Sequence, residues 1–444
     1  MQPPKHTFWI YLLLLTGLWW FADQTAWSSL DNFFRWRALW MQYSGVLGIG
    51  VMSLAMLLAI RPVVLEPHLG GLDKMYRLHK WLGISGLVLS LSHWLMAQGP
   101  KWLVGWGLLE RPSRSPQPAL PADSIQQFFA NQRHLAENIG EWAFYAALAL
   151  MVLALAKRFP YRWFFKTHRL LAVAYLALVW HSVVLMKFDY WSGVLGPVMT
   201  VLMAAGSVAA VLVLFRRVAV SRQIVGEVVA ITRHDALNVL ALDIQLKGRW
   251  PGHESGQFAF LTLHEDEGPH PFTISSAWTG DGRVQFIIKA LGDYTRTLAD
   301  RLRVGDPVKV EGPYGCFNFQ GEQSRQIWVG GGIGITPFIA RLQTLAQTPD
   351  GKAIDLFHTT AVYDAEAINL LERDAQAANI PLHVLWDKRD GRLDAERICK
   401  TVPDWRNADV WFCGPARFGQ ALKRDLTAMG LPERRFHQEL FALR

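Results

Sequence analysis

The chain divides into two halves that differ in how apolar residues are spaced. In the first 215 residues, six apolar stretches approach the roughly 20 residues that a helix needs to cross a hydrocarbon core. They cover residues 7–22, 43–60, 76–98, 139–156, 168–188 and 192–215. No small-residue cleavage site follows the first stretch, so we expect an uncleaved helix. The pattern predicts six membrane-spanning helices followed by a soluble part.

Short alternating segments begin near residue 220, with Gly and Pro between them. They lie at 224–231, 239–244, 258–263, 284–290 and 307–310, which is typical of a small antiparallel β-barrel. After residue 319, strands at 327–329 and 408–412 and a helix at 339–346 predict an α/β domain. We therefore expect three domains, at 1–219, 220–319 and 320–444.

Composition and charge agree with this division. Most of the 20 tryptophans lie in the first half, and Trp favours the membrane–water interface. The net charge of +8 could suggest nucleic acid, but much of the excess lies in short loops beside apolar stretches, where it sets topology. Cys316, Cys399 and Cys413 show no metal-site spacing and no disulfide framework, which suits a reduced compartment.

The loops also predict an orientation. Connection 61–75 has Arg61 and Lys74, with Arg77 and Lys80 at the start of the next stretch. Connection 157–167 is basic and has no acid, and Arg216 and Arg217 follow the last stretch. The connections 23–42 and 99–138 mix acids with bases. The positive-inside rule then places the N-terminus, the connections 61–75 and 157–167, and everything after residue 216 in the cytosol.

Four of the 14 histidines lie inside two apolar stretches, where a polar ring is costly and is by default a functional candidate. His79 and His93 are within about 40° of one helix face and about 21 Å apart along the axis, and His168 and His181 are about 20 Å apart. Because both stretches run in the same direction, His79 aligns with His168 near the inner surface, and His93 with His181 near the outer. Each pair could clamp one haem iron.

The spacing of the second pair presents an angular difficulty. On an ideal helix, His181 would point about 140° away from His168. Either the two haems meet that helix on different sides, or the helix is distorted between them. The alternative is that all four rings are packing histidines bonded to carbonyls, but two depth-matched pairs favour haem. Arg77 and Arg169 could hold haem propionates or act as topology signals.

The soluble half carries motifs suited to a dinucleotide. The segment 270–276 (His-Pro-Phe-Thr-Ile-Ser-Ser) lies on or beside a strand, and Lys289 and a Gly292-led helix N-terminus, which can bind phosphate, follow it. The glycine loop 330–338 lies between a strand and a helix, although it is not G-x-G-x-x-G. Cys413 ends a strand at the edge where doubly wound folds bind ligands, or it is a small buried apolar residue.

Taken together, these motifs resemble the NADPH oxidase and ferric reductase superfamily over essentially the full length. The match rests on His79-x13-His93, His168-x12-His181, His-Pro-Phe-Thr at 270–273, Gly-Gly-Gly-Ile-Gly-Ile-Thr-Pro-Phe at 330–338, Cys-Gly-Pro at 413–415 and Glu-Leu-Phe at 439–441. The resemblance implies a six-helix α transmembrane bundle holding two b-type haems, then an antiparallel β-barrel FAD domain and an α/β NAD(P)-binding domain.

The resemblance also implies roles for individual residues. The flavin ring and ribityl chain would be lined by His270, Pro271, Phe272 and Thr273, and the FAD phosphates would meet Lys289, Gly292 and Thr295. The nicotinamide dinucleotide would meet Gly331, Gly332, Gly334, Thr336, Pro337, Cys413, Gly414 and Pro415. The catalytic residues would be Cys413 near the reactive carbon, Thr273, and Phe441 stacked on the flavin. Arg35 or Arg37 would serve the outer haem propionate or an oxygen site.

Two features depart from the family pattern. Segment 358–364 lacks the arginine that we expect to grip a 2′-phosphate, although Arg389 or Arg392 could do so, and the choice between NADPH and NADH stays open. The sequence also shows no calcium-binding extension and no regulatory insert, so the resemblance implies a minimal prokaryotic member, integral to a bacterial inner membrane.

The function implied is electron transfer from cytosolic NAD(P)H through FAD and the inner, then the outer haem to an external acceptor. With both axial positions filled by histidine, the last transfer would be outer-sphere. The acceptor would be oxygen, giving superoxide, or ferric or cupric ions, or a periplasmic partner protein. Connection 99–138 has no Cys, Met or acidic cluster to hold metal, which favours oxygen. A non-redox six-helix channel with a nucleotide-sensing tail is a remote alternative.

Overall fold

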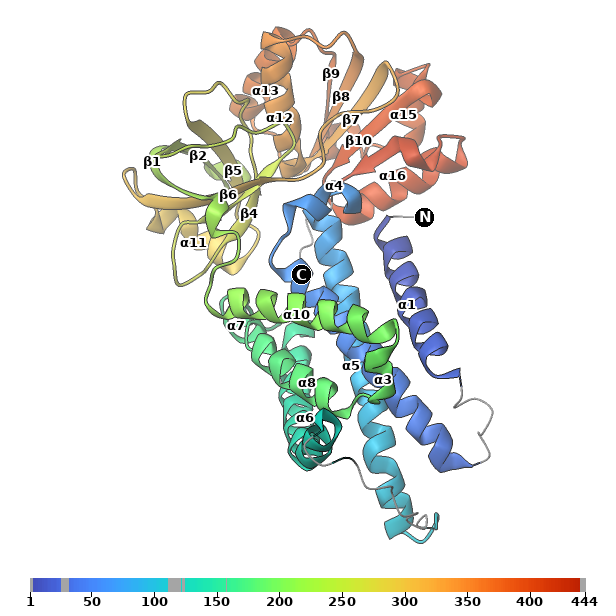
Figure 1. Cartoon of the computed structure of the whole chain (residues 1–444). Helices are drawn as coiled ribbons and strands as arrows, with labels where there is room; N and C mark the ends of the chain where they lie inside the picture. Colours follow the sequence, from blue (N-terminus) through green and yellow to red (C-terminus); the bar gives the residue numbers. More distant parts are fainter. Residues whose placement is uncertain (1–2, 25–31, 111–120, 122–123, 157, 440–444) are drawn as a thin grey trace. The chain divides into compact units, whose positions relative to one another are not determined.

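The structure is a computed structural model that describes residues 3–24, 32–110, 121, 124–156 and 158–439. It separates into two compact units, each described here by itself (Figure 1). One comprises Met1–Gly70 with Lys74–Val218, and the other Gly71–Asp73 with Ala219–Arg444.

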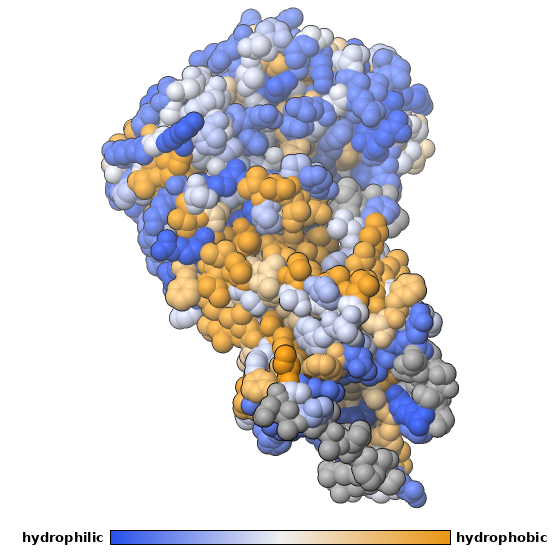
Figure 2. Space-filling view, in the orientation of Figure 1, coloured by the Kyte–Doolittle hydropathy of each residue, from blue (hydrophilic) through white to orange (hydrophobic). Residues whose placement is uncertain are grey.

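The first unit is helical. Its longer helices are α1 (Pro3–Ala22), α3 (Phe33–Ala59), α5 (Leu72–Gly105), α6 (Ile125–Leu155), α7 (Tyr161–His168), α8 (Leu171–Leu185) and α10 (Leu195–Leu214), with short α4 (Glu66–Leu69) and α9 (Asp189–Ser192) between them. Among the described residues, four helical segments are long and apolar enough to cross a membrane: Phe33–Ala59, Ile125–Leu155, Tyr161–Leu185 and Leu195–Leu214. Apolar side chains cover much of this surface (Figure 2). Crossing by α1 and α5 stays a prediction.

Several helices extend beyond the apolar stretches that predicted them. Helix α3 begins at Phe33 rather than at residue 43, and α6 at Ile125 rather than at 139. Both starts are capped, because the side chain of Asn32 accepts from Arg35 N and that of Ser124 accepts from Gln127 N. The apolar pattern finds only the part of a helix that lies in hydrocarbon, so polar helical ends were assigned to connections.

The predicted helix 168–188 is interrupted. Helix α7 ends at His168, α8 begins at Leu171, and Arg169 and Leu170 form a turn between them. This interruption lies between His168 and His181. Of the two alternatives for the angular difficulty, the structure therefore shows a distorted helix.

The second unit begins with a six-stranded antiparallel sheet in the order β4-β3-β6-β1-β2-β5. Its strands are β1 (Gln223–His234), β2 (Val239–Leu246), β3 (Phe258–Thr262), β4 (His270–Thr273), β5 (Arg283–Lys289) and β6 (Pro307–Tyr314), and α11 (Asp293–Arg301) follows β5. A single bridge, Ile274 to Phe286, joins the end of β4 to β5. The antiparallel sheet agrees with the sequence, and full closure into a barrel stays a prediction.

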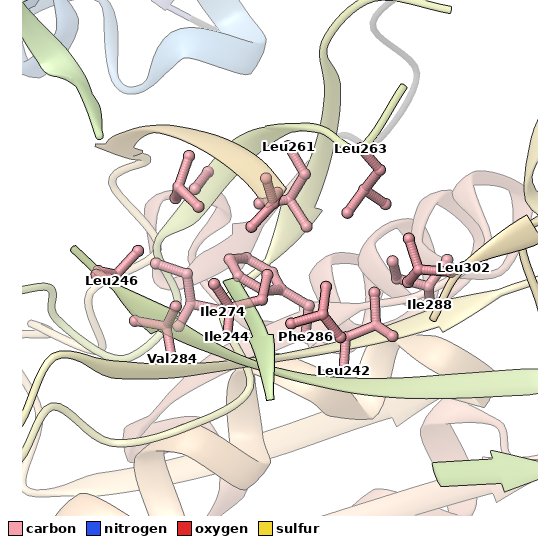
Figure 3. Packing of buried hydrophobic residues seen from close by; sticks show 14 of the residues in the cluster. Leu242, Ile244, Leu246, Leu261, Leu263, Ile274, Val284, Phe286, Ile288 and Leu302 are labelled. Atoms are coloured by element: carbon pink, nitrogen blue, oxygen red, sulfur yellow. The ribbon is translucent and has the colours of Figure 1, made fainter. Parts of the chain in front are cut away.

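Side chains on one side of this sheet form the hydrophobic core of the domain. Along β2, Leu240, Leu242, Ile244 and Leu246 are buried while the residues between them are only half-buried, as the two-residue period of a strand requires (Figure 3). Strand β5 alternates in the same way. The half-buried residues of β2 and β5 point away from this core.

The chain ends in a five-stranded parallel sheet in the order β11-β10-β7-β8-β9. The strands are β7 (Arg325–Gly331), β8 (Ala353–Thr360), β9 (Leu382–Trp386), β10 (Ala408–Cys413) and β11 (Phe436–Gln438). The helices are α12 (Thr336–Gln347), α13 (Ala365–Ala377), α14 (Asp387–Asp390), α15 (Ala395–Thr401) and α16 (Ala416–Ala428). This is the α/β arrangement that the sequence predicted.

Candidate functional site

The four histidines predicted to lie in the membrane meet as the two pairs expected from their spacing. The ring centres of His79 and His168 are 6.0 Å apart with an interplanar angle of 69°, and those of His93 and His181 are 6.3 Å apart at 74°. The members of each pair come from different helical segments, α5 on one side and α7 or α8 on the other.

Three of these rings are held through Nδ1. His79 Nδ1 lies 2.9 Å from Ala55 O, His181 Nδ1 lies 2.8 Å from Ala136 O, and His93 Nδ1 lies 3.0 Å from Ser44 Oγ. A histidine that binds metal through Nε2 usually makes such a bond with its other nitrogen, which fixes the tautomer and the ring orientation.

These distances fit a six-coordinate haem iron. A metal–imidazole bond of about 2 Å on each side, plus about 1 Å from each nitrogen to its ring centre, places two ring centres roughly 6 Å apart. Both pairs therefore have the separation that an iron ligated from both sides needs.

Arginines accompany both pairs. Arg77 and Arg169 are half-buried and lie next to His79 and His168 in the chain. Near the outer pair, Arg37 donates from Nε to Met96 O at 2.7 Å, and its charge acts on the His93 ring. Arg35 is exposed in the first turn of α3. Of the two arginines considered from the sequence, the geometry favours Arg37.

The predicted flavin residues gather where β4 meets the start of α11. His270 stacks on Tyr294 with ring centres 4.6 Å apart, and Tyr294 OH bonds to His264 Nδ1 at 2.8 Å. Burial lowers the pKa of His270 to about 4, so its ring is neutral at neutral pH. Thr273 is buried at the end of the same strand.

Two features there fit a flavin nucleotide. A Cβ at Gly292, the N-cap of α11, would meet nothing within 4 Å, so the helix N-terminus is open to a phosphate group. Within the described chain, the fully buried hydroxyl of Ser275 has no hydrogen-bond partner, so it could donate to a ligand. Thr295 Oγ1 instead accepts from Leu291 N and Gly292 N, so it caps α11.

The glycine loop after β7 packs directly on the segment after β10. A Cβ at Gly334 would lie 2.5 Å from the carbonyl carbon of Cys413 and 2.8 Å from Gly414 Cα, and one at Gly331 would lie 3.0 Å from Pro415 Cδ. Gly332 has a φ of +56° and open space around it. The structure therefore brings the two predicted nucleotide motifs together.

Thr336 and Pro337 form the first turn of α12, just after this loop. Thr336 is buried and its Oγ1 donates to Ile333 O at 3.2 Å, while Pro337 suits a first-turn position that has no intrahelical acceptor for an N–H. The N-terminus of α12 therefore faces the loop, as a pyrophosphate site needs.

Cys413 is fully buried at the end of β10. Burial, and the charge of Glu439 beside it, raise the pKa of the Cys413 thiol well above its ordinary value, so the thiol is neutral. Sequence reasoning quoted Glu439 in the final motif without giving it a role. The signal that marks it is a buried carboxylate in an otherwise apolar place, which only the fold reveals.

A cavity of about 320 Å³ lies between the two sheets of this unit. The half-buried faces of β2 and β5 form one wall, including Ala241, Ile287 and Lys289. Gly332, His358, Thr360 and Asp364 stand on the opposite wall together with residues of α12 and α13. Lys289 therefore lines the same cavity as Gly332 of the nucleotide loop, and its contact with the FAD phosphates stays a prediction.

Two predicted residues are not placed at the site. Arg389 makes a double hydrogen bond to Asp390, with both distances 2.9 Å, and no arginine lines the described cavity. Phe441 lies outside the described residues, so its stacking on the flavin stays a prediction.

His358 predicts acid sensitivity of the nucleotide-binding domain. Burial lowers its pKa from 6.5 to about 4, so below pH 6.5 the unfolded chain binds a proton that the folded chain does not. Stability should therefore fall as pH falls from 6.5 to 4, by up to about 3 kcal/mol. Thermal unfolding of the full chain across this range should show a shallower loss for His358→Gln. An equal loss of stability between pH 6.5 and 4 in the wild-type chain and in His358→Gln would contradict the role given to His358.

Comparison with known proteins identifies two domains. Residues 44–179 match the family described as ferric reductase like transmembrane component, and residues 227–318 match a FAD-binding domain family. The first match contains α5 to α7 and the first part of α8, with His79, His93 and His168, and it ends at residue 179, two residues before His181. Four apolar helices and this match make the chain an integral membrane protein.

Curated relatives resemble the soluble half. A flavohemoprotein of Bordetella pertussis is 29% identical over 222 residues, covering 44% of this chain and 54% of the relative. The glycine betaine monooxygenase reductase subunit of Pseudomonas aeruginosa is 26% identical over 205 residues, covering 42% and 55%. The chain thus spans about half the length of these relatives.

Among solved structures, a cytochrome P450 reductase from Amycolatopsis matches with a TM-score of 0.43 and 20% identity over 50% of this chain and 70% of that one. The family matches carry the identification, and the second of them supports binding of FAD. A ferric reductase like transmembrane component followed by a FAD-binding domain is the architecture of the NADPH oxidase and ferric reductase superfamily, and this chain has that architecture.

Proposed function

We propose that the chain is a transmembrane NAD(P)H oxidase. Electrons enter from cytosolic NAD(P)H, and oxygen on the other side of the membrane receives them and becomes superoxide. FAD and two haem b groups are the carriers between these two sides. The observation that carries the proposal is the pair of histidine pairs, with ring centres 6.0 and 6.3 Å apart.

The alternative of packing histidines explains these contacts less well. A packing histidine needs one hydrogen-bond partner, and Ala55 O, Ala136 O and Ser44 Oγ satisfy that need for three of the rings. It does not need a second imidazole held at the separation of two axial ligands. That this separation occurs twice supports two haem sites.

On the soluble side, the chain's residues bind and orient the nucleotides. The N-terminus of α11 at Gly292 would receive FAD phosphates, and His270 to Thr273 would line the flavin. The loop at Gly331–Gly334 and the N-terminus of α12 would receive the dinucleotide in the cavity. The neutral thiol of Cys413 puts no charge beside the nicotinamide, and Lys289 supplies a cation on the cavity wall.

When bound, FAD would accept two electrons together and release them singly, which haem requires because it accepts one electron at a time. The four histidines would hold each iron from both sides, and Arg77 and Arg169 would face inner propionates. Oxygen is favoured as the acceptor because connection 99–138 has no Cys, no Met and no acidic cluster to hold a metal ion.

A spectrum and an activity measurement on the purified chain test the proposal. The reduced-minus-oxidised spectrum should show b-type haem at about two per chain. NADH or NADPH consumption should be accompanied by cytochrome c reduction that superoxide dismutase suppresses. Absence of haem would refute the proposal. Reduction of ferric or cupric ions without superoxide, or activity that requires an added periplasmic protein, would refute oxygen as the acceptor.

A further inference from the structure

Helix α6 carries none of the four paired histidines, but it fixes the position of one of them, His181. His181 on α8 contacts α6 twice, first through the 2.8 Å bond between its Nδ1 and Ala136 O. Ala136 is fully buried, so this carbonyl is in a tight contact between the two helices. The bond fixes the orientation of the ring.

The second contact is with Gly140, one helical turn further along α6. A Cβ built on Gly140 would lie 2.5 Å from Cε1 and 2.7 Å from Cγ of His181, and closer still to Nδ1. The obstacle is an imidazole ring, which cannot bend away as the end of a flexible side chain can. The ring lies directly on the bare backbone of α6, so any other residue at position 140 must push it away.

Displacement of this ring would alter the outer pair. The ring faces His93 with 6.3 Å between centres, and both iron bonds depend on that separation. The inner pair lacks this dependence, because none of the atoms closest to any described glycine belongs to His79 or His168.

We propose that Gly140 is a positioning residue that determines whether the outer haem site can be occupied. The inference rests on the proposed function of the histidine pairs as haem ligands. It assigns to α6 a role in the electron path that its sequence, without a paired histidine, does not reveal.

The test compares Gly140→Ala with Gly99→Ala in the full-length chain. A Cβ at Gly99, on α5 six residues after His93, would meet nothing within 4 Å. Both changes put alanine into a helix, where it is intrinsically more favourable than glycine, so helix propensity is matched. Haem per FAD should fall by about half in Gly140→Ala, with loss of one component in a redox titration. Gly99→Ala should keep both components.

Two haems with unchanged midpoint potentials in Gly140→Ala would overturn the proposal. If Gly140→Ala is poorly folded, the same change is made in a chain that also carries His181→Ala, which lacks the ring that Gly140 accommodates. Gly140→Ala should lower the melting temperature of the wild-type chain but not that of His181→Ala. An equal drop in both backgrounds would also overturn the proposal.

This design separates the two hypotheses. A wild-type chain without b-type haem would refute the proposed function, whatever the Gly140 variants do. Two haems in the wild-type chain, and two haems with unchanged midpoint potentials in Gly140→Ala, would refute only the role of Gly140.

Discussion

Replacing His93 with alanine is expected to remove about half of the b-type haem signal and to stop superoxide formation. An iron held by two axial imidazoles would lose its protein bond on one side. The inner pair lies about 21 Å away along α5 and should keep its haem. Because the FAD and nucleotide motifs lie in another part of the chain, NADH or NADPH should still reduce ferricyanide, an acceptor that can take electrons at the flavin.

The control for this change is His134→Ala. His134 lies on α6 and bonds through Nδ1 to the side chain of Asn138 on the same helix, so it is also a histidine of the membrane unit. It should keep both haems and full superoxide formation. Full haem content in His93→Ala would mean that the outer pair is a packing contact and not a haem site.

The second large effect is expected at Gly334. Alanine there would place its Cβ 2.5 Å from the carbonyl carbon of Cys413, and neither backbone segment can yield without moving the nucleotide loop. Overpacking of this kind costs about 1–3 kcal/mol of folding stability. The displaced loop should also bind the dinucleotide more weakly, so KM for NADH or NADPH should rise about tenfold, which corresponds to about 1.4 kcal/mol of binding free energy. Bound FAD should be unchanged, because the flavin motifs lie on the other sheet.

Gly332→Asn is the matched change in the same loop. Gly332 has a positive φ, which asparagine tolerates, and its Cβ position is open. Its melting temperature should stay near that of the wild-type chain, whereas Gly334→Ala should lower it. Equal KM values for Gly334→Ala and the wild-type chain would show that the loop does not bind the dinucleotide.

Much of the fold could be predicted from the spacing of apolar residues. The alternation at 239–244 gave β2, and the apolar stretch 192–215 gave α10, because burial on one face or on all faces leaves a direct trace in the sequence. Polar helix ends such as 125–138 left no such trace. The interruption at Arg169–Leu170 was suggested only by the spacing of two histidines.

The site was predictable where a motif is local and less so where it depends on packing. The histidine pairs followed from depth along helices. The roles of Gly140 and Glu439 depend on contacts with His181 and Cys413, which are far away in the sequence. The alternation of β5 places Lys289 on the cavity wall, which the sequence alone did not indicate, and its contact with the FAD phosphates stays a prediction.

The turn at Arg169–Leu170 also changes the angle at which His181 points from the helix axis, relative to His168. On α5, His79 and His93 are 14 residues apart and lie on nearly the same helix face. His168 and His181 are only 13 residues apart, so on one continuous helix they would point in different directions. Because the helix is interrupted, α8 can take a different rotation about its axis from α7, so that His168 faces His79 and His181 faces His93. One residue inserted in α8 before His181 would rotate that ring by about 100° and misalign only the outer site.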